Sequence, residues 1–235
     1  MAQWSNFKNT RRSFQNISLS NNYSNNFSVL AIHGYAQSDV IFKSKLGSLR
    51  KGFKKEVEFT FLRAPHEVPM KSNFGSDGVE KGYGWWFNTE DHIFKAIVPS
   101  NLSVGFEDST AVIEKAFQES GPFDGILGFS QGAAFAVLLC FILFIVLKIK
   151  FDFAIIISGF KSLCTPHTMY YREKISIPSL HIYGEADQVI STEVSEMFVN
   201  KTTITHVGGH YVPSKKEYYT EFIIKMLEHK NKKNA

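Results

Sequence analysis

The sequence contains little cysteine and no cluster of metal-binding side chains. Cys140 and Cys164 are its only cysteines, and Cys140 lies in an apolar run, where a reduced thiol behaves as a small hydrophobic side chain. The eight histidines occur singly, and no Cys/His pattern has the spacing of zinc ligands. These absences argue against a disulfide framework. They predict a protein that uses no metal and no other cofactor and that occupies a reducing compartment, the cytoplasm.

A strong charge of one sign and a long apolar run are also missing. The net charge is only +4 and the basic residues are scattered, so the sequence predicts no nucleic-acid partner. The longest apolar run, at 133–147, is shorter than the roughly 20 residues that span a bilayer, and we expect a buried core helix there instead of a membrane span. The lysine-rich end at 230–235 is expected to be a disordered basic tail.

The first 26 residues contain no acidic side chain. They are rich in Asn and Ser, carry Lys8, Arg11 and Arg12, and lack the apolar segment of a secretion signal. We expect a disordered leader at 1–26, followed by a single domain at 27–229. A mitochondrial targeting role for the leader is the alternative to a cytoplasmic location.

Apolar stretches and helical patterns alternate along the rest of the chain. Stretches with strand character occur at 27–33, 56–62, 123–129, 151–158, 179–183 and 202–207. Helical patterns occur at 38–54, 107–119, 133–147, 191–199 and 215–228, and the segment at 63–102 has little periodicity. Continuous apolar strands separated by helices predict an α/β fold with a mostly parallel, twisted sheet covered by helices on both faces.

A Gly-x-Ser-x-Gly motif lies at the junction of a predicted strand and a predicted helix. It comprises Gly128, Ser130 and Gly132, and this position is the one that a nucleophile elbow requires. The hydroxyl of Ser130 would project at the amino end of the helix, where backbone N–H groups and the helix dipole favour negative charge. The motif therefore predicts an α/β-hydrolase fold with Ser130 as the nucleophile.

A serine nucleophile needs a histidine base and a carboxylate that orients it, and in this fold they follow in the order Ser, acid, His. Asp187 and His210 each follow a predicted strand, at the sheet edge where open α/β folds place their sites. We therefore predict Ser130, Asp187 and His210 as a catalytic triad. Glu185 is the rival acid, and His206, which lies within a predicted strand, is the rival base.

An oxyanion hole requires two backbone N–H donors, one after the nucleophile and one after an early strand. We assign them to Gln131 and Tyr35, with His33 and Gly34 shaping the turn. A structural role is expected for His33, and a second catalytic base is the alternative.

Four aromatic side chains lie close together in the long loop after the second predicted strand. They are candidates for the wall of an acyl-binding pocket, and ordinary packing of the loop onto the core is the alternative. These residues are Tyr83, Trp85, Trp86 and Phe87.

Several segments together resemble the FSH family of serine hydrolases. They are VLAIHGYAQS at 29–38, RAPHEVP at 63–69, GWWF at 84–87, GPFDGILGFSQGAA at 121–134, ISGF at 157–160, PSLHIYGEADQVI at 178–190 and GGHYVP at 208–213. The resemblance implies an α/β-hydrolase with the same triad. It also implies hydrolysis of small-molecule carboxylic esters with a leaning toward fatty acyl esters. The leader and the apolar stretch at 140–150 depart from the family pattern.

The same triad would serve an acyl-thioesterase or a peptidase, so these remain alternatives to an esterase. A non-catalytic binding protein on a hydrolase scaffold is an alternative from another class, but such a protein usually lacks one of the three groups.

Overall fold

The computed structural model describes residues 26–68, 81–143, 149–189 and 193–234. Within these ranges, six parallel strands form one sheet in the order β2-β1-β5-β6-β7-β8. The strands are β1 (Phe27–Ile32), β2 (Val57–Leu62), β5 (Gly125–Phe129), β6 (Phe153–Ile157), β7 (Ser179–Gly184) and β8 (Lys201–His206). Each strand falls on one of the predicted stretches, so the predicted parallel sheet is confirmed.

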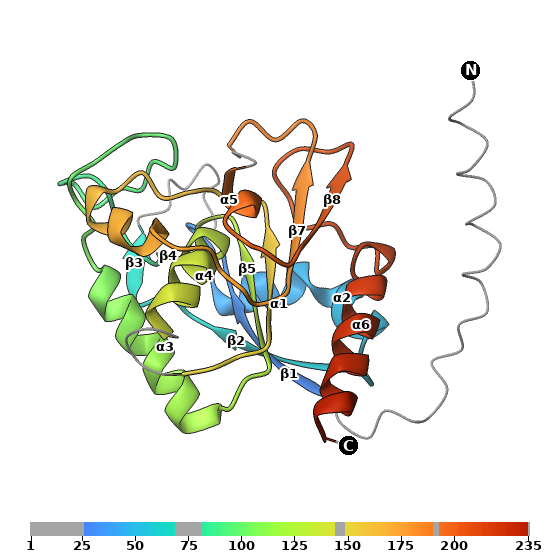
Figure 1. The fold of residues 1–235 in the computed structure, drawn as a ribbon. Coiled ribbons are helices and arrows are strands. Elements are labelled where there is room, and N and C mark those ends of the chain that lie inside the picture. Colours follow the sequence, from blue (N-terminus) through green and yellow to red (C-terminus); the bar gives the residue numbers. More distant parts are fainter. Residues whose placement is uncertain (1–25, 69–80, 144–148, 190–192, 235) are drawn as a thin grey trace.

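Helices cover both faces of the sheet (Figure 1). One face carries α3 (Phe106–Ser120) and α4 (Gln131–Phe141), and the other carries α1 (Asp39–Lys45), α2 (Gly47–Gly52) and α6 (Glu217–Asn234). Side chains alternate along a strand, so on β1 Leu30 and Ile32 join the first core while Val29 and Ala31 join the second. Burial on both faces explains why the central strands β1, β5 and β6 are almost continuously apolar, whereas the edge strands β2 and β8 carry exposed polar residues.

Some helices differ from the sequence prediction. The helix expected at 38–54 is divided in two, with α1 ending at Lys45 and α2 beginning at Gly47. The Ser38 hydroxyl caps α1 by accepting the N–H of Ile41 at 3.1 Å, as a favourable N-cap residue does. Of the helix expected at 191–199, the described part contains the short α5 (Glu193–Glu196).

Three short elements were not predicted. Strands β3 (His66–Val68) and β4 (Gly82–Gly84) pair antiparallel inside the segment expected to be a loop, and a 3-10 helix, η4 (Thr165–Tyr171), follows β6. Each is too short to leave a periodic pattern in the sequence.

The apolar run that follows the nucleophile forms a core helix. All eleven residues of α4 are buried between the sheet and the surrounding loops, and residues 144–147 of the run lie outside the described part. Within the part of the chain that the structure describes, no helix combines the length and the apolar character needed to cross a bilayer.

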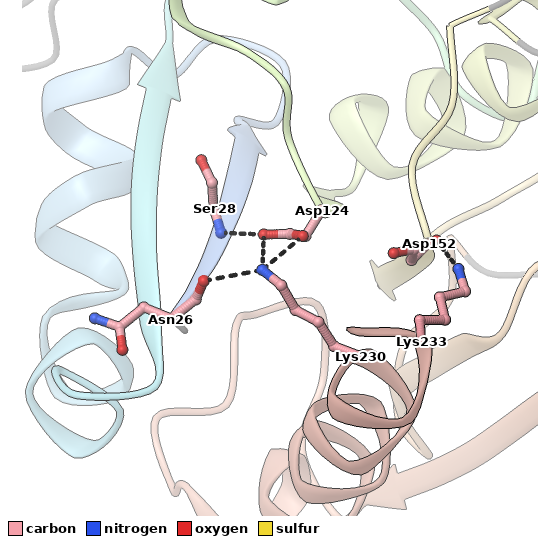
Figure 2. A network of polar contacts seen from close by, with 6 residues as sticks. All are labelled: Asn26, Ser28, Asp124, Asp152, Lys230 and Lys233. Carbon is pink, nitrogen blue, oxygen red and sulfur yellow. Dashed lines mark hydrogen bonds and ion pairs between the residues drawn. The ribbon is translucent and has the colours of Figure 1, made fainter. Parts of the chain in front are cut away.

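The expected disordered tail at 230–235 is a prediction that the described residues correct. Helix α6 continues to Asn234, and the Lys233 ammonium lies 2.6 Å from a carboxylate oxygen of Asp152 (Figure 2). The lysine-rich sequence suggested a solvated end, but Lys230 and Lys233 pair with Asp124 and Asp152, which immediately precede β5 and β6. The leader at 1–26 lies outside the described residues, except for Asn26.

A second contact fixes the end of α6 more firmly. The Lys230 ammonium lies 2.8 Å from Asp124 and donates to the Asn26 carbonyl at 3.2 Å (Figure 2). The same Asp124 carboxylate accepts the N–H of Ser28, in β1, at 2.8 Å. This cluster joins α6 to the start of β1 and to the residue that precedes β5.

Candidate active site

Ser130 occupies the sharp turn between β5 and α4. Its φ of 54° and ψ of −119° are an uncommon conformation for a residue other than glycine, as expected of a strained nucleophile elbow. A Cβ atom at Gly132 would lie 2.3 Å from the His33 carbonyl oxygen, and one at Gly128 would lie 2.5 Å from the Gly132 carbonyl oxygen. Both glycines of the motif are therefore required for this turn to fit against its neighbours.

The structure brings the three predicted triad residues into one hydrogen-bonded chain. His210 Nε2 lies 2.8 Å from Ser130 Oγ, and His210 Nδ1 lies 2.7 Å from Asp187 Oδ2. The Asp187 side chain is completely buried and its other oxygen accepts the Val189 N–H at 3.0 Å, whereas the His210 side chain is 29% exposed. The carboxylate is thus held away from water against the imidazole, which remains open to a substrate.

The rival acid and base lie elsewhere. Glu185 is exposed, and its carboxylate accepts a hydrogen bond from the Thr205 hydroxyl at 3.3 Å. His206 is buried at the end of β8, where its Nδ1 accepts the N–H of Gly208 at 3.1 Å. The acid that contacts the His210 ring is therefore Asp187, and the imidazole that contacts Ser130 is that of His210.

One predicted oxyanion donor, Gln131, directly follows Ser130, and the turn that carries the other, Tyr35, lies beside it. Gln131 is the first residue of α4, so its N–H has no partner within the helix. Its buried side chain accepts the Trp85 N–H at 2.9 Å and donates to the Trp86 carbonyl at 2.8 Å, which ties the elbow to the aromatic loop. A Cβ atom at Gly34 would lie 3.3 Å from Ser130 Cβ, which places the turn that carries Tyr35 directly beside the nucleophile.

His33 holds this turn through both nitrogens of its ring. Nε2 accepts the Ala64 N–H at 3.0 Å, so Nδ1 carries the proton and donates to the Gly34 carbonyl at 2.7 Å. The Gly34 carbonyl belongs to the same planar peptide group as the Tyr35 N–H. The hydrogen bond from His33 Nδ1 to this carbonyl therefore also fixes the direction of the Tyr35 N–H. Burial lowers the pKa of His33 to about 4, which keeps the ring neutral. His33 is therefore occupied structurally and is not a free second base.

The aromatic loop differs from the pocket hypothesis. Trp85, Trp86 and Phe87 are all buried, and Trp85 Nε1 donates to the His33 carbonyl at 2.7 Å. The Trp86 ring packs against Phe106 and Phe135 in the core. Within the described part of the chain, these three side chains therefore pack in the core and do not line an open pocket.

Tyr83 is the one member of the predicted set that remains half-exposed. It lies under the Arg63 guanidinium, 5.1 Å from ring centre to Cζ, and lines a hollow of about 220 Å³. An aromatic residue that was not predicted also contacts the turn that carries Tyr35: the half-buried Phe94 ring lies 5.4 Å from that of Tyr35, and the Phe94 N–H donates to the Tyr35 hydroxyl at 3.4 Å. Phe94 belongs to no motif, so the sequence had no signal for it.

Among the residues that the structure describes, no three side chains of His, Cys, Asp or Glu are grouped so that they could hold a metal ion. The hydrogen-bonded side chains of Ser130, His210 and Asp187 are arranged for proton transfer from the serine hydroxyl.

Known proteins resemble this chain over most of its length. A family model described as serine hydrolase (FSH1) matches residues 23–222. Esterase OVCA2 of Xenopus tropicalis is 41% identical over 218 residues, covering 85% of this chain and 93% of the relative. Esterase OVCA2 of Homo sapiens is 35% identical over 228 residues, covering 85% of this chain and 96% of the relative.

Solved structures show the same fold at lower sequence identity. The crystal structure of esterase PE8 aligns with a TM-score of 0.57 and 20% identity, covering 86% of this chain and 92% of that one. An identity this low supports the common architecture alone, which is that of the α/β-hydrolases.

Proposed function

The chain belongs to the serine hydrolase (FSH1) family, and from this premise we propose that it cleaves carboxylic esters through an acyl-enzyme formed on Ser130. The observation that carries the proposal is the pair of short hydrogen bonds, 2.8 Å and 2.7 Å, that connect Ser130 to His210 and His210 to Asp187. The relatives named esterases support the choice of esters as substrates.

Acylation begins with proton transfer from Ser130. His210 Nε2 accepts the hydroxyl proton as Oγ attacks the ester carbonyl carbon, and Asp187 stabilises the imidazolium and holds its tautomer. The negative charge that forms on the carbonyl oxygen is bound by the N–H groups of Gln131 and Tyr35. His210 then returns the proton to the departing alkoxide, which leaves as the alcohol.

Deacylation repeats the same chemistry with water. His210 accepts a proton from a water molecule as its oxygen attacks the acyl carbon, and the proton passes to Ser130 Oγ when the carboxylic acid leaves. Every proton is returned, so the enzyme ends each cycle in its starting state.

Medium- and long-chain acyl esters are the substrates that we expect within this class. With Trp85, Trp86 and Phe87 buried, the half-buried rings of Tyr35 and Phe94 are the aromatic surface adjoining the donor turn. An acyl chain lying on such a surface gains roughly 0.8 kcal/mol for each methylene that it buries, so longer chains should react with higher kcat/KM until the surface is covered.

A series of p-nitrophenyl esters of increasing acyl length tests both parts of the proposal. The parent should hydrolyse them with a preference for longer chains, and Ser130→Ala should lower kcat/KM by about 10³-fold or more. Ser176→Ala, at an exposed serine, is the matched control and should behave like the parent. Equal turnover by the parent and Ser130→Ala would remove Ser130 from the mechanism. Equal kcat/KM for short and long chains would remove the acyl preference alone.

A further inference from the structure

The loops that carry Asp187 and His210 form one hydrogen-bonded unit at the ends of the neighbouring strands β7 and β8 (Figure 1). The Glu185 N–H donates to the His206 carbonyl at 2.8 Å, and the Ala186 N–H donates to the Gly208 carbonyl at 3.1 Å. The two loops approach so closely that a Cβ atom at Gly184 would lie 2.1 Å from the Gly208 carbonyl oxygen.

The turn that presents His210 has little rigidity of its own. It consists of Gly208 and Gly209, and glycine has the widest range of backbone conformations of any residue. Such a turn must be held by its contacts if the imidazole is to stay between Ser130 and Asp187. Besides the bonds between the loop backbones, a side chain also bonds the backbone of this turn: His206 Nδ1 accepts the Gly208 N–H at 3.1 Å.

The His206 ring is itself fixed in place. It is buried at the end of β8, with the ring of Tyr211 at 4.6 Å and that of Tyr218 at 6.2 Å. Because Nδ1 accepts a hydrogen bond from an N–H, the ring is neutral and carries its proton on Nε2. Nε2 is buried without a hydrogen-bond partner among the described residues, so the Nδ1 bond is the polar contact that the ring makes there.

We propose that His206 is a positioning residue for His210, acting through its hydrogen bond to the Gly208 N–H. The inference rests on the proposed function, because it assumes that His210 is the base. Its role is distinct from catalysis, since its contacts lie on the turn and its tyrosine neighbours and not on Ser130. Catalytic geometry tolerates little displacement, and a misplacement of about 1 Å can lower the rate by about a hundredfold.

Burial is consistent with this role. It lowers the pKa of His206, while the nearby carboxylates of Asp187 and Glu185 act in the opposite direction. The neutral form is the form that accepts the Gly208 N–H.

Two substitutions at position 206 separate the hydrogen bond from simple packing. His206→Leu removes the acceptor, whereas His206→Asn places an amide oxygen near the position of Nδ1 and keeps one. His181→Leu is the matched control. His181 is a buried histidine on β7 whose contacts are the Ser179 hydroxyl at 3.0 Å and the Phe198 ring at 4.8 Å.

The kinetic arm measures kcat and KM with a p-nitrophenyl ester, together with the melting temperature of each variant. We expect His206→Leu to lower kcat by about tenfold to a hundredfold with KM within about twofold of the parent, because positioning acts on the transition state. His206→Asn should recover most of the loss. His181→Leu should lower the melting temperature and leave kcat within about twofold.

The second arm measures hydrogen exchange at the Gly208 amide, which does not depend on catalysis. Exchange should become faster in His206→Leu and remain slow in His206→Asn, because a bonded amide is protected. The proposal is overturned if His206→Leu keeps kcat within about twofold, if Gly208 exchange is unchanged, or if His206→Asn is as impaired as His206→Leu. A parent without esterase activity would instead refute the proposed function, and Gly208 exchange would still decide whether His206 holds the turn.

Discussion

Replacing Lys230 with methionine should destabilise the fold, because this change removes a charge from a mostly buried pair. The Lys230 and Asp124 side chains are only 18% and 21% exposed, and the ammonium lies 2.8 Å from the carboxylate. Methionine keeps an apolar chain over the Phe27 ring, where the Lys230 ammonium lies 5.2 Å from the ring centre. The variant therefore isolates the loss of the charge from the loss of packing.

The size of the effect follows from the degree of burial. Exposed ion pairs contribute roughly 0.2–1 kcal/mol, whereas removal of one partner from a fully buried pair costs about 3–5 kcal/mol. The Lys230 pair lies between these limits, so we expect a loss of about 2 kcal/mol. For a chain of this length each kcal/mol lowers the melting temperature by about 2–4 °C, which gives a decrease of about 4–8 °C.

Lys233→Met is the matched control on the same helix. Lys233 and Asp152 are 52% and 39% exposed, so this pair should contribute less than about 1 kcal/mol (Figure 2). Thermal unfolding followed by circular dichroism measures both variants in the same buffer. Equal melting temperatures for the two variants, or a Lys230→Met value within about 1 °C of the parent, would refute the reasoning from burial.

Three further predictions concern pH, loop packing and the aromatic loop. The free energy of unfolding should fall as pH decreases from about 7 toward 4. Burial lowers the pKa of His33 and His167 to about 4 and that of His181 to about 3, whereas an unfolded histidine has a pKa of about 6.5. The unfolded chain therefore binds more protons than the folded one in this pH range, and acid favours unfolding. Each such group contributes at most about 1.4 kcal/mol per pH unit, and urea unfolding that gave equal stability at pH 7 and pH 5 would contradict this. Gly184→Ala should lower kcat by about a hundredfold, because the added Cβ atom would force apart the loops that carry Asp187 and His210. Gly47→Ala is the control and should retain kcat, because a Cβ atom there would have no neighbour within 4 Å. Equal kcat values for the two variants would contradict the close packing. Trp86→Ala should cost about 3–5 kcal/mol of stability without altering the preference for acyl length. A changed preference among p-nitrophenyl esters would show that Trp86 contacts the acyl chain.

The sheet and the triad could be predicted because their signals are local. The central strands β1, β5 and β6 are nearly continuous apolar runs, and the glycines around Ser130 mark a turn that only small residues permit. Asp187 and His210 could then be placed by order, since both follow strands of the same parallel sheet.

The aromatic loop and the C-terminus could not be predicted because their surroundings are set by distant residues. Trp86 is buried by side chains of α3 and α4, which the sequence near it does not indicate. Lys230 and Lys233 resemble a solvated charge run, yet their partners Asp124 and Asp152 lie 106 and 81 positions away along the chain. Pairing across such separations is a property of the fold and leaves no local pattern.

Labelling with a fluorophosphonate probe tests the central claim most directly, because the probe reacts with a serine only where a base and an oxyanion hole activate it. The account predicts one covalent adduct, located by mass spectrometry on the peptide that contains Ser130, and its loss in Ser130→Ala. Asp187→Asn should slow the labelling far more than Glu185→Gln, because Asp187 contacts the His210 ring at 2.7 Å. An unlabelled parent, or an adduct that persists in Ser130→Ala, would contradict the account.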